Sequence, residues 1–145
     1  MNLSDALLHP SEYDGAEISA YWQPVIGDNS SVLHVSVFGN LFLLNEQGHV
    51  LLLDSWSGDI HGVSESYEQY KTDVGTDPEF FRSWFLTDLI ELLDAGGMTR
   101  GAGQVFAPFV SPALGGRLVL ENFSTAPIKT YAALSSGEVL ARRKV

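Results

Sequence analysis

Cysteine is absent from this chain of 145 residues. Its absence excludes a disulfide scaffold, a cysteine-based zinc site, an iron–sulfur cluster and a cysteine nucleophile. Long apolar runs are absent too, whereas a bilayer-spanning helix needs about 20 such residues. The segment Met1–Pro10 has no basic residue and carries Asp5, which is not the pattern of a signal peptide. We therefore expect a soluble, cytoplasmic protein with no membrane partner.

Basic residues are scarce, and they are missing from the first half of the chain. Residues 1–70 contain ten carboxylates and no lysine or arginine, and the whole chain carries a net charge of −10. From Ala95 onward the balance reverses, with 2 acidic and 6 basic residues. An acidic field repels nucleic-acid phosphate, so we expect no direct binding of nucleic acid. The same field favours a basic protein partner, or serves solubility alone.

The C-terminal cluster Arg142-Arg143-Lys144 is the one basic run in the sequence. Chain ends are commonly solvated, so we expect these side chains to face water rather than to form a binding patch.

Composition predicts a globular single domain over residues 1–145, because 45% of the residues are hydrophobic and 18% are charged. Apolar periodicity and turn residues predict helices at 16–26, 64–70 and 78–94. They predict strands at 31–37, 41–44, 50–53, 60–63, 104–110, 117–122, 128–134 and 138–141. Strands, then helices, then strands again indicate an α+β fold with a mostly antiparallel sheet and a few helices packed on it.

Two of these elements are marked by clear local sequence features. Asp77 and Pro78 are a capping residue and a first-turn proline, so they mark the start of a helix. The runs 41–44 and 50–53 are joined by a short polar loop with glycine, which is typical of a β-hairpin. Ser64 is the expected cap of the short helix at 64–70.

Motifs of catalysis and cofactor binding are not found. The glycines between Gly96 and Gly103 follow a helix, whereas a phosphate-binding loop precedes one. Ser57 lies outside the strand–turn–helix pattern of a serine nucleophile. The four histidines have no metal-ligand spacing: His9, His34, His49 and His61. We expect no enzymatic activity, no cofactor and no metal.

A protein-binding surface is the function class that remains. Several aromatic residues lie in acidic or turn-rich sequence and suit either an interface anchor or ordinary burial: Tyr13, Tyr21, Trp22 and Trp56.

Two short stretches resemble a known family when they are taken together. The first is Phe38–Leu44, then Gly48-His49-Val50 and Leu53–Gly58; the second is Pro112–Gly116, followed by Glu121-Asn122. Over about residues 33–137 the chain resembles bacterial immunity proteins against type VI secreted DNase toxins, whose domain follows GAD-like regions and is related to the SUKH group. We expect close backbone approach at Gly39, a glycine-dependent turn at Gly115-Gly116 and loop hydrogen bonds from Asn122.

The resemblance implies a SUKH-like fold and a non-enzymatic immunity protein that binds and neutralises a cognate toxin, with a basic nuclease as the expected partner. The alternative is a ligand-binding or regulatory domain of the same fold without a toxin partner. Under the first hypothesis the expected partner-binding residues are an acidic face with one aromatic anchor: Asp54, Trp56, Asp59, Glu65 and Glu68.

Overall fold

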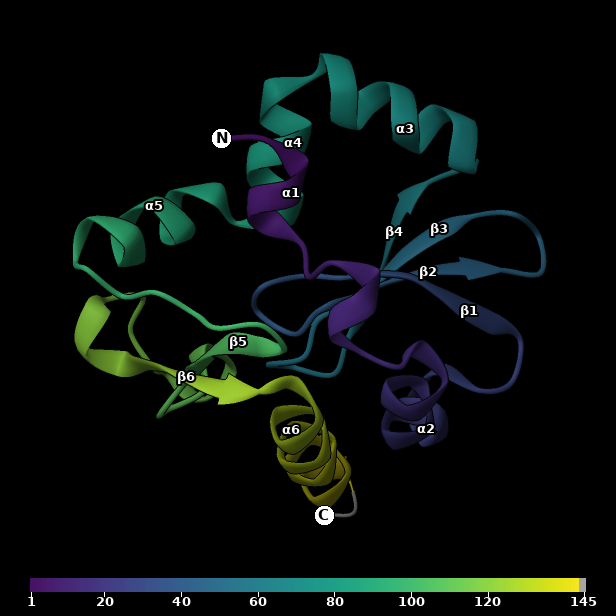
Figure 1. Cartoon of the computed structure of the whole chain (residues 1–145). Coiled ribbons are helices and arrows are strands. Elements are labelled where there is room, and N and C mark those ends of the chain that lie inside the picture. The colour runs from purple at the N-terminus through teal and green to yellow at the C-terminus, as the bar shows by residue number, and fades with distance from the viewer. Residues whose placement is uncertain (144–145) are drawn as a thin grey trace.

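The computed structural model describes residues 1–143 and has the predicted α+β architecture (Figure 1). Its elements in chain order are α1 Leu3–Ala6, the 3-10 turn η1 Pro10–Glu12, α2 Gly15–Ile26, β1 Ser30–Val35, β2 Leu41–Asn45, β3 Val50–Leu53, β4 Ile60–Ser64, α3 Tyr67–Thr76, α4 Pro78–Phe85, α5 Thr87–Ala95, β5 Gln104–Pro108, η2 Pro112–Leu114, η3 Leu120–Asn122, β6 Phe123–Pro127 and α6 Ile128–Arg143. Within this described part, every helix is too short or too polar to cross a bilayer.

Strands β1 to β4 form an antiparallel meander in chain order, and the predicted hairpin is the β2–β3 pair. Both faces of this sheet are covered. Leu41 and Leu43 are fully buried on one face, and Phe42 is fully buried on the other. Strand β4 lies at the edge of the sheet, and its first three residues are exposed.

Helices α3 and α4 cover one face of the four-stranded sheet (Figure 1). The rings of Phe42 and Phe85 stack with centroids 4.7 Å apart, and Tyr70 lies 5.8 Å from Phe42. His34 packs 5.9 Å from Tyr70, and burial lowers the pKa of His34, so its ring is neutral at pH 7. Phe42, Tyr70 and Phe85 are therefore core residues.

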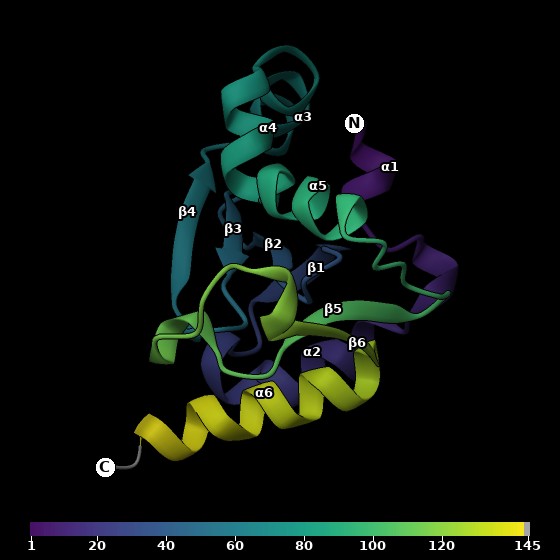
Figure 2. The same cartoon turned by 90° about the vertical axis from the view of Figure 1, so that its left-hand side faces the viewer.

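Helix α2 packs beside the opposite face and beside α6 (Figures 1 and 2). Asp14 caps it, with its carboxylate accepting the backbone N–H of Ala16 at 3.0 Å. Ile18 and Trp22 point into the core, and Trp22 is completely buried. Burial in the core is therefore the role of Trp22, and it is not an interface anchor.

The single helix predicted at 78–94 is two helices. Asp77 and Pro78 begin α4 as expected, but Leu86 adopts φ 56° and ψ 45° and separates α4 from α5. Leu86 is the one non-glycine residue with positive φ among residues 1–143. The break lets α4 and α5 run in different directions, so both Phe85 and Leu93 reach the core (Figure 2). The preceding helix, α3, is capped by Ser66 instead of Ser64.

The end of the chain also differs from its prediction. The strands predicted at 117–122, 128–134 and 138–141 are wrong, because β6 is the only strand beyond residue 108 in the described chain and α6 follows it directly. The buried positions of α6 recur at helical spacing: Ile128, Tyr131, Ala132, Ser135, Ser136 and Val139. Two of them are serines, so the apolar periodicity that reveals a helix is broken in the sequence.

Strands β5 and β6 form a separate two-stranded sheet, which meets the larger one at Phe38. The Phe38 ring lies 5.9 Å from Trp56, 5.9 Å from Phe106 and 6.2 Å from Phe123. Beside it, a Cβ at Gly39 would come within 2.4 Å of the Tyr131 ring, which confirms the close approach expected at this glycine. The β1–β2 turn therefore fills the junction of the two sheets.

The contact of Gly58 with α6 gives a stability test. Gly58 has φ +79°, and an added Cβ would lie 2.3 Å from Cγ1 of Val139. We expect Gly58→Ala to cost about 2–4 kcal/mol, since left-handed strain and overpacking add. Gly48→Ala is the matched control: Gly48 has φ +80° with nothing within 4 Å, so strain of about 1–2 kcal/mol remains. Urea unfolding of both variants measures the difference, and equal losses would contradict the packing argument.

Candidate partner-binding surface

The turn Asp54–Asp59 connects β3 to β4 and is bonded to two other parts of the chain. Ser55 is fully buried. Its N–H donates to Oδ1 of Asn40 at 2.9 Å, and its hydroxyl lies 2.7 Å from the hydroxyl of Tyr131 on α6. The hydroxyl of Ser135 donates to the carbonyl of Ser55. These bonds hold the turn between the β1–β2 connection and α6.

The last turn of α6 adds two charged donors to the same segment. Arg142 donates to the carbonyl of Trp56 at 2.9 Å, and Arg143 donates to the carbonyl of Gly58 at 2.7 Å. The prediction of a solvated basic cluster is therefore wrong for Arg142, which is half-buried, whereas Arg143 is exposed and also bonds to the turn. Lys144 lies outside the described residues.

The connection between β5 and β6, residues 109–122, is fixed by Asn122. Its side chain accepts the N–H of Val110 at 3.0 Å, and donates to the carbonyls of Val110 at 2.9 Å and Arg117 at 3.0 Å. A Cβ at Gly116 would overlap the carbonyl oxygen of Val110, and Gly115 has φ +92°. The roles expected for Gly115-Gly116 and Asn122 are confirmed, and together they fold the connection into one compact loop.

This loop displays large apolar side chains to solvent. Their exposed fractions are 71% for Phe109, 51% for Val110, 59% for Leu114 and 49% for Leu118. Leu134 on α6 is 65% exposed and lines the same hollow as Phe109. Apolar groups gathered in this way mark interaction surfaces. Phe109, Val110, Leu118 and Leu134 fall in predicted strands and Leu114 in the Pro112–Gly116 pattern, so the sequence did not reveal this surface. The signal available was apolar residues set among Pro108, Pro112 and Gly115-Gly116.

The loop runs between α4–α5 and α6 beside the start of β4 (Figure 2). It lines two of three neighbouring hollows, through Phe109 and Leu118. The first, of about 280 Å³, is lined by Trp56 and Phe109. The second, of about 210 Å³, is lined by Trp56, Trp84 and Leu86. The third, of about 290 Å³, is lined by Leu86 and Leu118. The first and second hollows share Trp56, and the second and third share Ser83 and Leu86; we call the three together the Trp56 groove.

Carboxylates accompany the Trp56 groove along its length. Glu138 lines the first hollow, Asp54 the second, and Glu79 and Asp88 the third. Arg82 is the single lysine or arginine among these lining residues, and its guanidinium is 2.9 Å from Glu79 and 3.9 Å from Asp88. The groove thus combines apolar walls with a net negative border.

The five residues expected from the sequence are placed at two ends of β4. Asp54 and Trp56 line the groove, and Asp59 is exposed beside them where β4 begins. Glu65 and Glu68 are exposed beyond the other end of the strand. Five residues of β-strand span about 17 Å. The structure therefore brings the first three together and separates them from the last two.

Trp56 itself is half-buried. Its ring contacts Phe38 and lies 6.3 Å from Phe123, while the residue also lines two of the hollows. Its carbonyl accepts hydrogen bonds from Arg142 and Ser111. The surroundings hold Trp56 firmly in place at the base of the groove.

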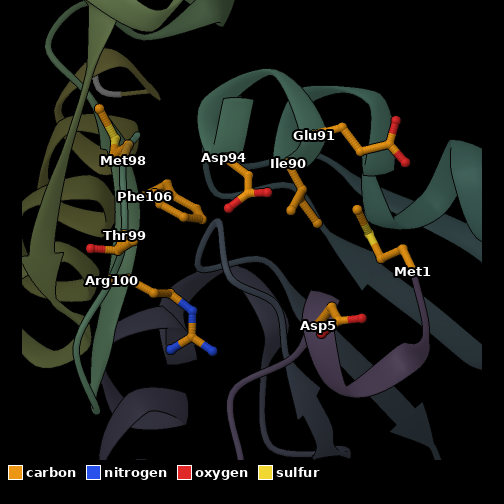
Figure 3. Close-up of a pocket in the computed structure, with 9 residues that line it drawn as sticks. All are labelled: Met1, Asp5, Ile90, Glu91, Asp94, Met98, Thr99, Arg100 and Phe106. Carbon is orange, nitrogen blue, oxygen red and sulfur yellow. The ribbon is translucent and has the colours of Figure 1, made fainter. Parts of the chain in front are cut away.

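A separate hollow of about 490 Å³ lies between α1, α5 and the segment before β5 (Figure 3). Asp94 and Arg100 face its gap from opposite sides. Arg100 is paired with Glu12 at 3.2 Å. Burial alone would raise the pKa of Glu12, but backbone N–H groups of Gly103 and His9, together with Arg100, hold it below its usual value. Within residues 1–143, no three histidine or carboxylate side chains are grouped closely enough to hold a metal ion.

The family model described as "T6SS immunity protein Tdi1, C-terminal" matches residues 64–137, about half of the chain. The chain belongs to this family. The match to the Tdi1 C-terminal family includes Leu86, the loop at 109–122 and the first turns of α6, so it covers two walls of the Trp56 groove. It contains the sequence pattern at Pro112–Asn122, whereas the pattern at Phe38–Gly58 lies outside it. The predicted relation to type VI secretion immunity proteins is confirmed.

A solved structure shows the same fold. It is described as "Crystal structure of Atu4351 from Agrobacterium tumefaciens" and aligns with a TM-score of 0.52 at 15% identity. The alignment covers 86% of this chain and 64% of that chain, so this member of the Tdi1 C-terminal family spans less than two thirds of the solved protein. No curated protein matches the sequence.

The hydrogen bonds of the Asn122 side chain predict how the loop at 109–122 responds to mutation. Asn122→Ala removes three hydrogen bonds to loop backbone groups. We expect a loss of about 1–3 kcal/mol of stability, concentrated in residues 109–122. Hydrogen exchange should show faster exchange at the amides of Phe109 and Gly116, with unchanged exchange in β2 and β3. Uniformly faster hydrogen exchange across the chain would contradict a purely local role of Asn122.

Proposed function

We propose that this protein is a non-enzymatic immunity protein of type VI secretion that binds a cognate toxin, and that the toxin is a basic nuclease. The match to the Tdi1 C-terminal family carries the proposal of toxin neutralisation. Neutralisation by binding requires no reaction step. A complex with a Kd of about 1 nM, equivalent to about −12 kcal/mol, leaves little toxin free.

The use of basic side chains inside the fold supports a basic partner. Lys71 pairs with Glu68 at 2.9 Å, and Lys129 pairs with Glu17 at 3.1 Å. Arg142 and Arg143 bind backbone carbonyls. The surplus of carboxylates is therefore left facing solvent, including Asp59, Glu65, Glu91 and Asp94. A nuclease holds phosphate with cationic groups, so such a surface is complementary to it.

We propose that the carboxylates along β4 attract the toxin. Asp54 and Asp59 at one end of the strand, and Glu65 and Glu68 at the other, form an acidic border about one strand long. Charged borders of this kind raise association rates and are screened by salt. Trp56 lies within the same border, and its half-buried position suits an anchor.

The alternative, a ligand-binding or regulatory domain without a toxin partner, would use the hollow beside Arg100 (Figure 3). In that hollow Arg100 is already paired with Glu12, while Asp5, Glu91 and Asp94 add negative charge. The favoured small ligand would be a cation with an apolar part. The experiment below separates this alternative from the immunity proposal.

The test is co-expression with the protein encoded beside this gene. We expect this protein to keep cells alive when an active toxin is produced, and to co-purify with a catalytically inactive form of that toxin. Survival with no change in nuclease activity in lysate would contradict neutralisation by binding. Absence of any complex with the neighbouring protein would overturn the immunity proposal and favour the ligand-binding alternative.

Charge removal tests the acidic border. The quadruple variant Asp54→Asn, Asp59→Asn, Glu65→Gln and Glu68→Gln should slow association with the inactive toxin roughly tenfold at low salt, with little effect at high salt. Stopped-flow mixing measures both rates. The matched control removes four exposed carboxylates elsewhere: Asp28, Glu91, Asp94 and Glu121. Equal slowing in the two variants would show that net charge matters and that this face does not.

A further inference from the structure

We propose that the Trp56 groove is the docking site for a segment of the toxin that combines apolar side chains with lysine or arginine. This inference rests on the proposed function and names the surface that supplies its affinity. The groove is the row of three hollows joined at Trp56 and Leu86, with Phe109 and Leu118 on the flanking loop.

Apolar side chains of the partner fit the walls. The second hollow is bounded by Leu52, Trp84 and Leu86, and the first by Trp56 and Phe109. Aromatic residues in partly enclosed pockets dominate interface energetics. Covering the exposed faces of such side chains removes apolar surface from water, which is favourable by about 25 cal/mol per Å².

Charge identifies the occupant. Glu138, Asp54, Glu79 and Asp88 follow the groove from one end to the other, and the paired Arg82 is the opposing charge among its lining residues. A second copy of this chain is disfavoured, because each copy carries a net charge of −10. A cationic segment meets these carboxylates while its apolar residues enter the hollows.

The walls are held in place before binding. Leu86, at the corner between two hollows, is fixed in the left-handed conformation between α4 and α5. The opposite wall is fixed by the three hydrogen bonds of Asn122, and Trp56 by Arg142. Because these segments are already ordered, association loses less conformational entropy than it would with mobile loops.

Leu118→Arg is the primary test. It places a bulky cation in the third hollow, where it opposes a cationic partner and blocks apolar contact. We expect affinity for the inactive toxin to fall on the order of 30-fold or more, measured by calorimetry. Leu92→Arg is the matched control: Leu92 is 41% exposed on α5 and lines none of the three hollows, whereas Leu118 is 49% exposed. We expect Leu92→Arg to bind like the wild type.

A second variant at the other end guards against a local folding defect. Leu134→Arg changes a residue that is 65% exposed on α6 and lines the first hollow. Both variants should keep the wild-type urea midpoint, because neither side chain is buried. Weakened binding in both supports the groove. Wild-type affinity in both, or equal weakening by Leu92→Arg, overturns it.

A binding experiment with model peptides tests the groove independently of the immunity proposal. A helical peptide of leucine and lysine should shift the indole N–H signals of Trp56 and Trp84 in NMR spectra, and a leucine–glutamate peptide should not. Leu118→Arg should abolish the shift. If the neighbouring toxin does not bind the wild type, the proposed function fails, and the peptide experiment still decides the groove. No shift at millimolar peptide overturns the groove.

Discussion

The Asp54–Asp59 turn, in which Ser55 and Gly58 are buried, is the constraint on which the rest of the structure depends. The buried part of such a turn must find partners for its N–H and carbonyl groups, because each unpaired group costs about 1–3 kcal/mol. Here the partners come from far along the chain: Asn40 from the β1–β2 connection, and Ser135, Arg142 and Arg143 from α6. Those bonds explain why α6 carries Ser135 on its buried side and arginines in its last turn. They also set Trp56 at the base of the groove.

Internal contacts of the basic side chains also determine the charge of the surface. Lysine and arginine are few in this chain. Within residues 1–143 most of them make contacts with other parts of the protein, such as Arg100 with Glu12 and Lys129 with Glu17. These contacts are mostly at the surface, where an ion pair contributes little to stability, in the range of about 0–1 kcal/mol. Their larger effect is on the outside of the molecule: in the described chain Lys71, Arg82, Arg100 and Lys129 are ion-paired, whereas most of the 18 carboxylates are not, so the surface keeps a net negative charge. The acidity of the sequence is therefore a property of the surface offered to a partner.

Structural features that depend on neighbouring residues could be predicted from the sequence, whereas features that depend on tertiary contacts could not. Asp77-Pro78 located a helix start, and the polar loop before Val50 located the hairpin, because capping and turn formation depend on a few neighbouring residues. The α6 helix was missed because two buried positions are serines: Ser135, which bonds to the Ser55 carbonyl of the turn, and Ser136, which bonds to the Ala133 carbonyl of its own helix. Leu86 gave no signal, since leucine is a good helix former and its left-handed conformation is imposed by packing. Of the expected partner-binding residues, Asp54, Trp56 and Asp59 come together and remain a prediction as a binding face.

A rigid groove and a charged border have different consequences for inhibition. The border acts at a distance, so it affects how fast a partner arrives and is weakened by salt. The groove acts on contact, so it affects how slowly the partner leaves, and most differences in affinity between related complexes lie in that rate. A protein that must stop a toxin before damage accumulates needs fast arrival and slow departure together. In this fold the two properties meet at Asp54 and Trp56, which lie two residues apart in the turn that α6 holds in place.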